Sequence, residues 1–414
     1  MVKQINFDEV LIADLHIHSR FSRACSKDLN IPNLVKWARI KGIGLLGTGD
    51  FTHDVWLKEI EDSLKSNLKG FYYYEDKVGK FPFIITGEVS LIYTQEKGRR
   101  VHLVLLVPSV EVAKEINKYL DTKGRRDYDG RPIFKISCEE FVREMKKISE
   151  DIEIIPAHIW TPWFGIFGSK GGFASLKEAF GDEVDNVYAI ETGISSDPEM
   201  NWRINELENR AIVSFSDSHS FWPWRLGREA TIFNKCDSYK ELINQIRKNN
   251  FIATIETDPA YGKYHVDGHR NCKYSCEPNK TKELNGICPI CKKELVIGVE
   301  YRIEEIASHE KNFTPKNAKF FYRLLPLHEI LSLYYNVSMN SKKVWEIYNN
   351  LIKEFSNEFN ILINVSREDL LKVSEEKLVD LILKNRDGKI KVKPGYDGEY
   401  GVAIVDERQE KLMG

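Results

Sequence analysis

Seven short apolar runs separated by amphipathic segments constrain the fold of the first 260 residues of this 414-residue chain. Each run has four to seven residues, and several are rich in Val and Ile, as buried parallel strands are. Strands that alternate with helices predict a parallel sheet, and about seven such units can close into a barrel. The runs are Leu11–Ile17, Ile43–Gly47, Phe83–Thr86, Val101–Val107, Ile152–Ile155, Val187–Ile190 and Ala211–Phe215.

Helical signals lie between these runs and again near the C-terminus. The segment Pro32–Lys41 begins with Pro and is followed directly by Gly42, as helices often are. A capping-box pattern, Ser137-Cys138-Glu139-Glu140, precedes the segment Phe141–Ser149. Past Tyr261 the periodicity fades until helical patterns return from Pro315 onward, and the tail is predicted to form short strands around turns. The predicted helices are Pro32–Lys41, Phe141–Ser149, Asp237–Asn249, Leu325–Tyr335, Lys342–Phe355 and Glu375–Asn385, and the tail is Lys391–Val405.

Composition narrows the class of protein. Hydrophobic residues make up 42% and charged residues 29%, a balance typical of globular proteins, and the length predicts two or three domains. Without a long apolar run or a signal-peptide pattern, the chain is expected to be cytoplasmic and to have no membrane partner. The net charge of −2 means that any nucleic-acid binding must come from local patches.

A His or carboxylate accompanies every apolar run, usually at its C-terminal end. In a parallel barrel these ends meet at one face, where active sites lie. His and carboxylate side chains are ligands for Zn²⁺, Mn²⁺ or Fe, and the His-x-His spacing on a strand sends both rings to one side. The residues are Asp14, His16, His18, Asp50, His53, Glu88, His102, His158, Glu191, Asp217 and His219.

A single His at the end of a strand is more often structural than a metal ligand. A His or carboxylate at each of seven predicted strand ends is hard to explain by coincidence, so the sequence predicts a metal site. Such a site suits phosphoryl chemistry, because bound ions lower the pKa of a water and neutralise charge on the attacked phosphate.

The motifs around these residues resemble those of the polymerase-and-histidinol-phosphatase (PHP) family. Asp14-Leu15-His16-Ile17-His18-Ser19 looks like its first motif, and Gly47 to Asp50, Gly87-Glu88, His102, Ala157-His158 and Ser216 to His219 match later ones in order. The resemblance covers about residues 10–260. It implies a distorted (βα)7 barrel, two or three divalent ions (Zn²⁺, Mn²⁺ or Mg²⁺) and metal-dependent phosphoester hydrolysis.

The resemblance also implies roles for individual residues. Glu88 is expected to bridge two ions, and Asp217, Glu88 and His158 are expected to be catalytic. Two departures affect one metal position: Arg23-Ala24-Cys25 stands where many members carry a further His, and Thr48-Gly49-Asp50 replaces a Thr-Asp-His triplet. The expected ligands are His16, His18, Asp50, Glu88, His102, His158, Asp217 and His219, with His53 and Glu191 as further candidates.

Four of the seven Cys residues lie within twenty residues of each other. The pairs Cys272-x3-Cys276 and Cys288-x2-Cys291 predict a closed, structural Zn²⁺ site in a small loop-rich module. Two disulfides are the alternative, which a reducing compartment disfavours. His265 and His269 lie just upstream and could replace one thiolate.

Two loops rich in aromatic residues directly follow predicted metal ligands. Stacking faces and guanidinium groups beside a metal site suit bases and phosphates, although such loops could equally fill the mouth of a barrel. The candidate DNA-binding residues are Trp160, Trp163, Phe164, Trp222, Trp224, Arg225 and Arg228.

The combination of the PHP motifs, the loop after His158, the four-Cys module and Pro394-Gly395-Tyr396-Asp397-Gly398 resembles the endonuclease Q family over nearly the whole chain. That resemblance implies a PHP domain at 1–262, a zinc-binding module at 263–312 and a mostly helical domain at 313–414. It implies a repair enzyme that extrudes the damaged base and nicks DNA 5′ to uracil, hypoxanthine, xanthine or an abasic site, with replication or repair factors as candidate partners.

Two other functions remain open from the residues. A small-molecule phosphatase of the histidinol-phosphate type would explain the barrel and leave about 150 C-terminal residues without a role. A nucleic-acid-binding module with a degenerate metal site would explain the loops, but the ligand set is nearly complete.

Overall fold

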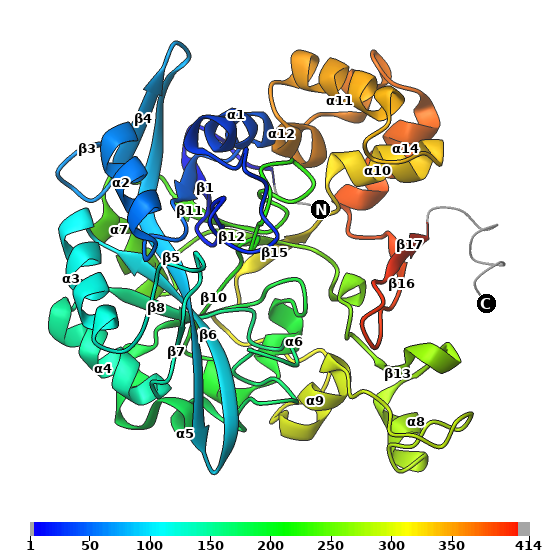
Figure 1. The fold of residues 1–414 in the computed structure, drawn as a ribbon. Coiled ribbons are helices and arrows are strands. Elements are labelled where there is room, and N and C mark those ends of the chain that lie inside the picture. Colours follow the sequence, from blue (N-terminus) through cyan, green and yellow to red (C-terminus); the bar gives the residue numbers. More distant parts are fainter. Residues whose placement is uncertain (1–3, 405–414) are drawn as a thin grey trace.

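The computed structural model describes residues 4–404 and shows a mixed α/β fold. A central sheet of eleven strands carries the motifs around His16, Asp50, Glu88, His102 and His158, with helices around it (Figure 1). Its strands are β1 (Val10–Asp14), β2 (Leu45–Gly47), β3 (Lys65–Ser66), β4 (Tyr72–Asp76), β5 (Gly79–Gln95), β6 (Lys97–Val107), β7 (Ile133–Phe134), β8 (Glu153–Pro156), β11 (Ala230–Asn234), β12 (Ala253–Glu256) and β15 (Phe320–Arg323).

Three strand pairs lie outside this sheet. They are β9 (Ala189–Glu191) with β10 (Ala211–Val213), β13 (Asp267–His269) with β14 (Tyr274–Cys276), and β16 (Lys391–Lys393) with β17 (Val402–Ile404). The predicted tail Lys391–Val405 thus contains two strands, and Val405 itself lies outside the described residues. In Figure 1 the β13 and α8 region lies beside β16 and β17, and a bridge between Val266 and Tyr396 joins the two.

The central sheet is mixed, so the expectation of a parallel sheet is wrong in part. Strand β2 is parallel to both β1 and β5, whereas β5–β6, β6–β8, β1–β11 and β11–β12 are antiparallel. The runs in β5 and β6 are joined by a tight turn at Glu96, where φ is 61°, instead of by a helix. An antiparallel pair needs only such a turn, and a parallel pair needs a long crossover. Closure into a (βα)7 barrel stays a prediction.

All seven apolar runs lie in or overlap strands, and the predicted helices are present. Helix α1 (Ile31–Lys41) begins where the Asn30 side chain accepts a hydrogen bond from the backbone N–H of Asn33, and it ends at Gly42 with φ 97°. The other helices around the sheet are α2 (Asp54–Ser63), α3 (Val110–Asp121), α4 (Cys138–Ile148), α5 (Leu176–Phe180), α6 (Pro198–Trp202) and α7 (Tyr239–Arg247), followed by α8 (Pro278–Glu283) and α9 (Val299–Ile306).

The central sheet and the helices around it form a first region of the fold. The C-terminal helices form a second region, which packs against the first beside α1 (Figure 1). They are α10 (Leu327–Tyr335), α11 (Lys342–Phe355), α12 (Glu358–Ile363), α13 (Arg367–Leu371) and α14 (Glu376–Arg386). Strand β15, which belongs to the predicted C-terminal domain, pairs with β12 and extends the central sheet. No helix within residues 4–404 combines the length and apolarity that a membrane crossing requires.

The buried Lys41 ammonium joins the two regions. It donates to Glu358 Oε1 at 2.7 Å and to the Pro223 carbonyl at 2.7 Å. Nearby, an aromatic cluster consists of Trp37, Trp222, Trp224, His328, Trp345 and Tyr348, whose rings come from α1, the loop after β10, α10 and α11. This loop carries both candidate arginines, so the C-terminal helices help to position it.

Candidate functional site

Four predicted ligands meet in a first cluster at the ends of β1 and β10 and on β5. His16, His18, Glu88 and Asp217 place one ligand atom each within 4.8 Å of the others. His18 Nε2 lies 3.0 Å from Asp217 Oδ1 and 3.3 Å from Glu88 Oε2. His16 Nε2 lies 3.5 Å from each of the same two oxygens.

A second cluster shares Glu88 with the first. Glu88 Oε1 lies 2.8 Å from His102 Nδ1 and 3.3 Å from His158 Nε2, and these two nitrogens are 3.3 Å apart. Glu88 therefore turns one carboxylate oxygen to each cluster, which is the arrangement of a carboxylate that bridges two ions.

The donors of the first cluster fit a divalent cation. His16 Nε2 is buried and has no hydrogen-bond partner among the described residues, although its ring has a fixed orientation. Burial favours the neutral ring, but the surrounding carboxylates Glu191, Glu88 and Asp217 raise the pKa of His16 well above its usual value. This strong attraction for positive charge is what a cation site requires.

Two further predicted ligands instead orient the histidines. Glu191 holds His16 Nδ1 at 2.9 and 3.0 Å and accepts from the backbone N–H of His158 at 2.9 Å. Asp50 holds His18 Nδ1 at 2.9 Å, and its other oxygen accepts from Ser19 and Ser22. Both carboxylates lie outside the two clusters. Carboxylates that fix the far nitrogen of a ligating His are common in metal sites.

His53 and His219 also lie outside both clusters. His53 stacks on Phe21 with ring centroids 4.1 Å apart and is not among the donors of either cluster. His219 packs 4.2 Å from the His18 ring, and its Nδ1 lies 3.1 Å from the Asp217 carbonyl oxygen. His219 remains at the wall of the site without joining the four donors.

The backbone at the site is held in an unusual conformation. Asp50, His158 and Asp217 have φ values of 46°, 32° and 47°, in the left-handed region that non-glycine residues seldom adopt. Such strain persists where the surrounding structure fixes it and is concentrated at functional sites.

A third cluster differs in one member from the predicted set of four Cys ligands. His269, Cys272, Cys288 and Cys291 offer atoms within 4.8 Å of one another, whereas Cys276 lies apart with its Sγ 3.3 Å from Thr281 Oγ1. In the β13–β14 hairpin His269 faces Tyr274, and Cys276 lies two residues further along. At about 3.3 Å per residue that shift removes Cys276 from the cluster. Three thiols and one imidazole still form a four-donor set suited to a structural ion.

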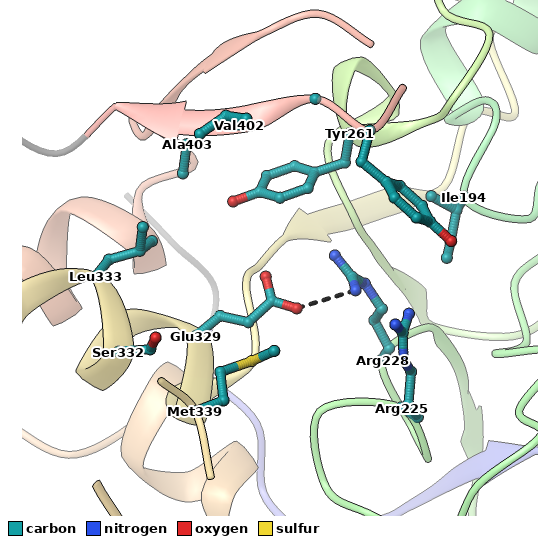
Figure 2. Close-up of a pocket in the computed structure, with 12 residues that line it drawn as sticks. Ile194, Arg225, Arg228, Tyr261, Glu329, Ser332, Leu333, Met339, Val402 and Ala403 are labelled. Atoms are coloured by element: carbon teal, nitrogen blue, oxygen red, sulfur yellow. Dashed lines mark ion pairs between the residues drawn. The ribbon is translucent and has the colours of Figure 1, made fainter. Parts of the chain in front are cut away.

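One cavity adjoins the first two clusters, and a second pocket shares lining residues with it. The main cavity has a volume of about 650 Å³ and is lined by His102, His158, Asp217 and His219 among others. The side pocket, of about 270 Å³, lies against α10 and β17. Both are lined by Ile194, Arg225, Arg228 and Tyr400, so one wall is common to them. Figure 2 shows the side pocket, where Arg228 and Glu329 form an ion pair of 3.0 Å.

The predicted DNA-binding residues divide between the cavities and the core. Trp163 and Phe164 line the main cavity, and Phe164 packs on His102 at 4.3 Å. Trp160 is only 1% exposed and donates to Asn201 Oδ1 at 2.8 Å, so burial corrects its predicted DNA contact.

Trp224 is also corrected, because it is 9% exposed and packs edge-on against His328. Trp222, in the same aromatic cluster, is 36% exposed. Arg225 lines both cavities and makes no side-chain ion pair within residues 4–404, whereas Arg228 is neutralised by Glu329.

Sequence reasoning missed Arg131, Glu329 and Tyr400. Arg131 donates from Nη1 to Glu88 Oε2 at 3.0 Å, yet it lies in a loop with no motif. Glu329 and Tyr400 come from the C-terminal region, and only the packing of that region against the sheet reveals their place at the cavities.

Comparison with known proteins finds a family model for the C-terminal helices. The family model of the MJ0043 C-terminal domain matches residues 326–389, the stretch of α10 to α14. The protein MJ0043 of Methanocaldococcus jannaschii is 34% identical over 351 residues, which cover 79% of this chain and 43% of that protein. The chain therefore spans less than half the length of this curated relative.

The fold and the clusters define a mixed α/β protein with candidate metal centres, and solved structures give the family. The crystal structure of the lesion-specific endonuclease PfuEndoQ from Pyrococcus furiosus is 31% identical, covers 97% of both chains and aligns with a TM-score of 0.86. Endonuclease Q in complex with a 27-mer duplex that carries an abasic lesion at the active site is also 31% identical, covers 96% of this chain and 97% of that one, and has a TM-score of 0.85. The chain belongs to the endonuclease Q family.

Proposed function

We propose that this protein is a DNA repair endonuclease that nicks the phosphodiester 5′ to a deaminated base or an abasic site by metal-assisted hydrolysis. The observation that carries the proposal is the position of Glu88, whose two oxygens face two ligand clusters on the wall of the main cavity. The likeness to a solved endonuclease Q bound to abasic DNA supports DNA as the substrate.

The chain offers distinct donor sets for its ions. His16, His18, Glu88 and Asp217 would hold one active-site ion, and Glu88, His102 and His158 a second. Bound ions would neutralise phosphate charge and lower the pKa of a water. A third active-site ion has fewer free donors, since the Asp50 oxygens already serve His18, Ser19 and Ser22. Zn²⁺, Mn²⁺ and Mg²⁺ all remain candidates for this site, and structural Zn²⁺ is proposed for the Cys/His cluster.

The surfaces around the main cavity suit a distorted nucleic acid. Trp163, 37% exposed, and Phe164 offer rings on which bases can stack. Arg225 lines both cavities and has no ion-pair partner among residues 4–404, so its guanidinium would be available to a phosphate of an extruded nucleotide. Extrusion costs least at damaged or mispaired bases, which itself favours lesions.

The side pocket has the chemistry to receive the extruded base. Its walls include the apolar Leu333, Met339 and Ala403, with Glu329 as a hydrogen-bond acceptor (Figure 2). One Glu329 oxygen faces Arg228, and the other has no hydrogen-bond partner in the described chain. Deamination turns the acceptor N3 of cytosine, or N1 of adenine, into an N–H donor. A free carboxylate oxygen would therefore favour uracil over cytosine and hypoxanthine over adenine.

Duplex oligonucleotides with one uracil, hypoxanthine or abasic site, incubated with Mg²⁺ or Mn²⁺, test the function directly. A single nick 5′ to the lesion is expected, with intact undamaged duplex as the control. Phosphate release from small esters without nicking would favour a phosphatase, and binding without cleavage would favour a nucleic-acid-binding module.

Glu329→Gln tests the role of the side pocket. We expect slower cleavage at uracil and hypoxanthine and unchanged cleavage at the abasic site, which has no base to bind. Exposed Glu346→Gln on α11 is the matched control. Equal loss on all three substrates would contradict base recognition by Glu329.

Other features of the proposal rest on the sequence. The division at 262 and 312, the cytoplasmic location and association with replication or repair factors stay predictions, as does action on xanthine.

A further inference from the structure

Arg131 is a cation placed at the centre of the candidate active site. Its Nη1 donates to Glu88 Oε2 at 3.0 Å, and its side chain, 25% exposed, lines the main cavity. Its remaining N–H groups have no hydrogen-bond partner within residues 4–404 and are not among the buried unsatisfied atoms, so they face the open cavity. The guanidinium thus touches the carboxylate shared by both clusters and retains free donors toward the space beside them.

The chain fixes this position through the backbone next to Arg131. A Cβ at Gly130 would lie 2.2 Å from Asp50 Oδ2 and 2.3 Å from Ser22 Oγ, so only glycine allows the segment to approach the site this closely. The Gly130 N–H donates to the Phe21 carbonyl at 3.1 Å, and its own carbonyl accepts from Thr52 Oγ1 at 3.1 Å.

The far side of Arg131 is also held. The Pro132 carbonyl accepts from the backbone N–H of Ser90, two residues from Glu88 on β5, at 3.0 Å. The Arg131 N–H donates to Asp129 Oδ1 at 3.1 Å. The backbone is therefore tied to the strand that carries Glu88, which limits how far the guanidinium can move from the clusters.

The other arginines of the main cavity come from the loop after β10. Arg225 and Arg228 also line the side pocket, and Arg228 is paired with Glu329. Within residues 4–404, Arg131 is the only arginine that forms an ion pair with a member of the first two clusters. A phosphodiester held beside the clusters would meet this guanidinium first, and planar guanidinium groups match two phosphate oxygens.

We propose that Arg131 is a catalytic residue that contacts a non-bridging oxygen of the scissile phosphate and stabilises the charge that develops there during hydrolysis. The proposal rests on the proposed endonuclease function. In the reaction a water oxygen forms a bond to phosphorus and loses a proton, while the phosphorus–oxygen bond to the departing strand end breaks and that oxygen takes up a proton. Fixed cations at such a phosphoryl group act by electrostatic stabilisation.

A structural role would have a different signature. If Arg131 only neutralises Glu88, its removal should change metal binding at the clusters. If it contacts the phosphate, metal binding should persist and the loss should fall on kcat.

The test compares Arg131→Ala, Arg131→Lys and the control Arg143→Met, an exposed arginine on α4, in the full chain. For Arg131→Ala we expect kcat on an abasic duplex to fall about 100- to 1000-fold, with KM within about threefold and an unchanged metal content by mass spectrometry. Added guanidinium ion should restore part of kcat.

Arg131→Lys keeps the charge without the planar fork, and we expect an intermediate loss. It also keeps the proposal testable if Arg131→Ala does not fold. Unchanged kcat in both variants, or loss of metal in parallel with loss of activity, would overturn the proposal. Failure of the unmodified protein to nick any lesion would instead refute the endonuclease function.

Discussion

Histidines are buried in two very different surroundings in this protein. At the metal-site clusters His16 and His18 are buried beside carboxylates, which raise the pKa of both rings well above the usual value despite burial. In the aromatic cluster His328 is also fully buried, but neither ring nitrogen has a hydrogen-bond partner among the described residues. Burial, with a smaller contribution from Lys41, lowers the pKa of His328 to about 3.

The contrast shows that partners decide what a buried His can do. Carboxylates hold the first pair of rings in fixed orientations and attract positive charge, as a cation site needs. The rings of Tyr348, Trp345 and Trp224 surround His328 at 3.9, 4.3 and 5.0 Å, and none of them supplies a carboxylate that would stabilise a protonated ring. The two metal-site clusters are organised for chemistry, and the aromatic cluster is organised for packing between two parts of the fold.

The largest effect should follow from Glu88→Gln, because Glu88 belongs to both clusters. We expect nicking of an abasic duplex to fall at least about 1000-fold and active-site metal to be lost. Metal analysis and single-turnover cleavage measure this, with Glu346→Gln as control. Substantial activity in the variant would show that Glu88 does not bridge two ions.

The Cys/His cluster extends the comparison to a third kind of surrounding. His269→Ala should release the structural ion and destabilise the module, whereas Cys276→Ser should keep it, because Cys276 lies outside the cluster. Zinc content and thermal unfolding of the two variants decide between the ligand sets. Loss of zinc in Cys276→Ser alone would restore the four-Cys prediction.

A smaller effect is expected where a carboxylate orients a His without joining a cluster. Asp50→Asn should weaken the hold on His18 Nδ1 and lower metal affinity or activity about 10- to 100-fold. Titration of the metal-free protein with Mn²⁺, followed by cleavage, measures both. An effect as large as that of Glu88→Gln would place Asp50 among the ligands themselves.

The smallest effect concerns the pH dependence of stability at His328. The unfolded ring takes up a proton below about pH 6.5, while the folded ring does so only near 3, so stability present at neutral pH is lost as the pH falls through this window. The loss from this residue is about 2 kcal/mol at pH 5. His328→Phe should remove it, so that the free energy of unfolding in urea falls less between pH 7.5 and pH 5. The same fall in both proteins would show that His328 takes up its proton in the folded state.

Much of the fold and part of the site could be predicted from the sequence. Local patterns sufficed for the strands and for α1, because apolar runs and caps act over a few residues. Donors near the ends of the apolar runs predicted the meeting of His16, Glu88 and Asp217, although Glu88 lies within the long strand β5 and not at its end.

The remainder depends on contacts that no local pattern encodes. Two serines that donate to the second oxygen of Asp50 favour an orienting role over ligation, and no local pattern predicts them. Arg131 reaches the clusters through a glycine that fits against Asp50, and His269 replaces Cys276 through the register of a hairpin. Alternation of strands with helices predicted that β6 would run parallel to its neighbours, but a tight turn joins β5 directly to β6 and makes the pair antiparallel.

The link from Lys41 to Glu358 and Pro223 bears on whether the protein can be divided. Without the C-terminal helices the Lys41 ammonium would lose its carboxylate partner, and Arg228 would lose Glu329. Lys41 and Arg228 belong to the region of the central sheet, whereas their carboxylate partners, Glu358 and Glu329, belong to the C-terminal helices. The two regions are therefore an obligate pair in the folded chain, and a shortened protein that ends before α10 should be defective in folding as well as in recognition.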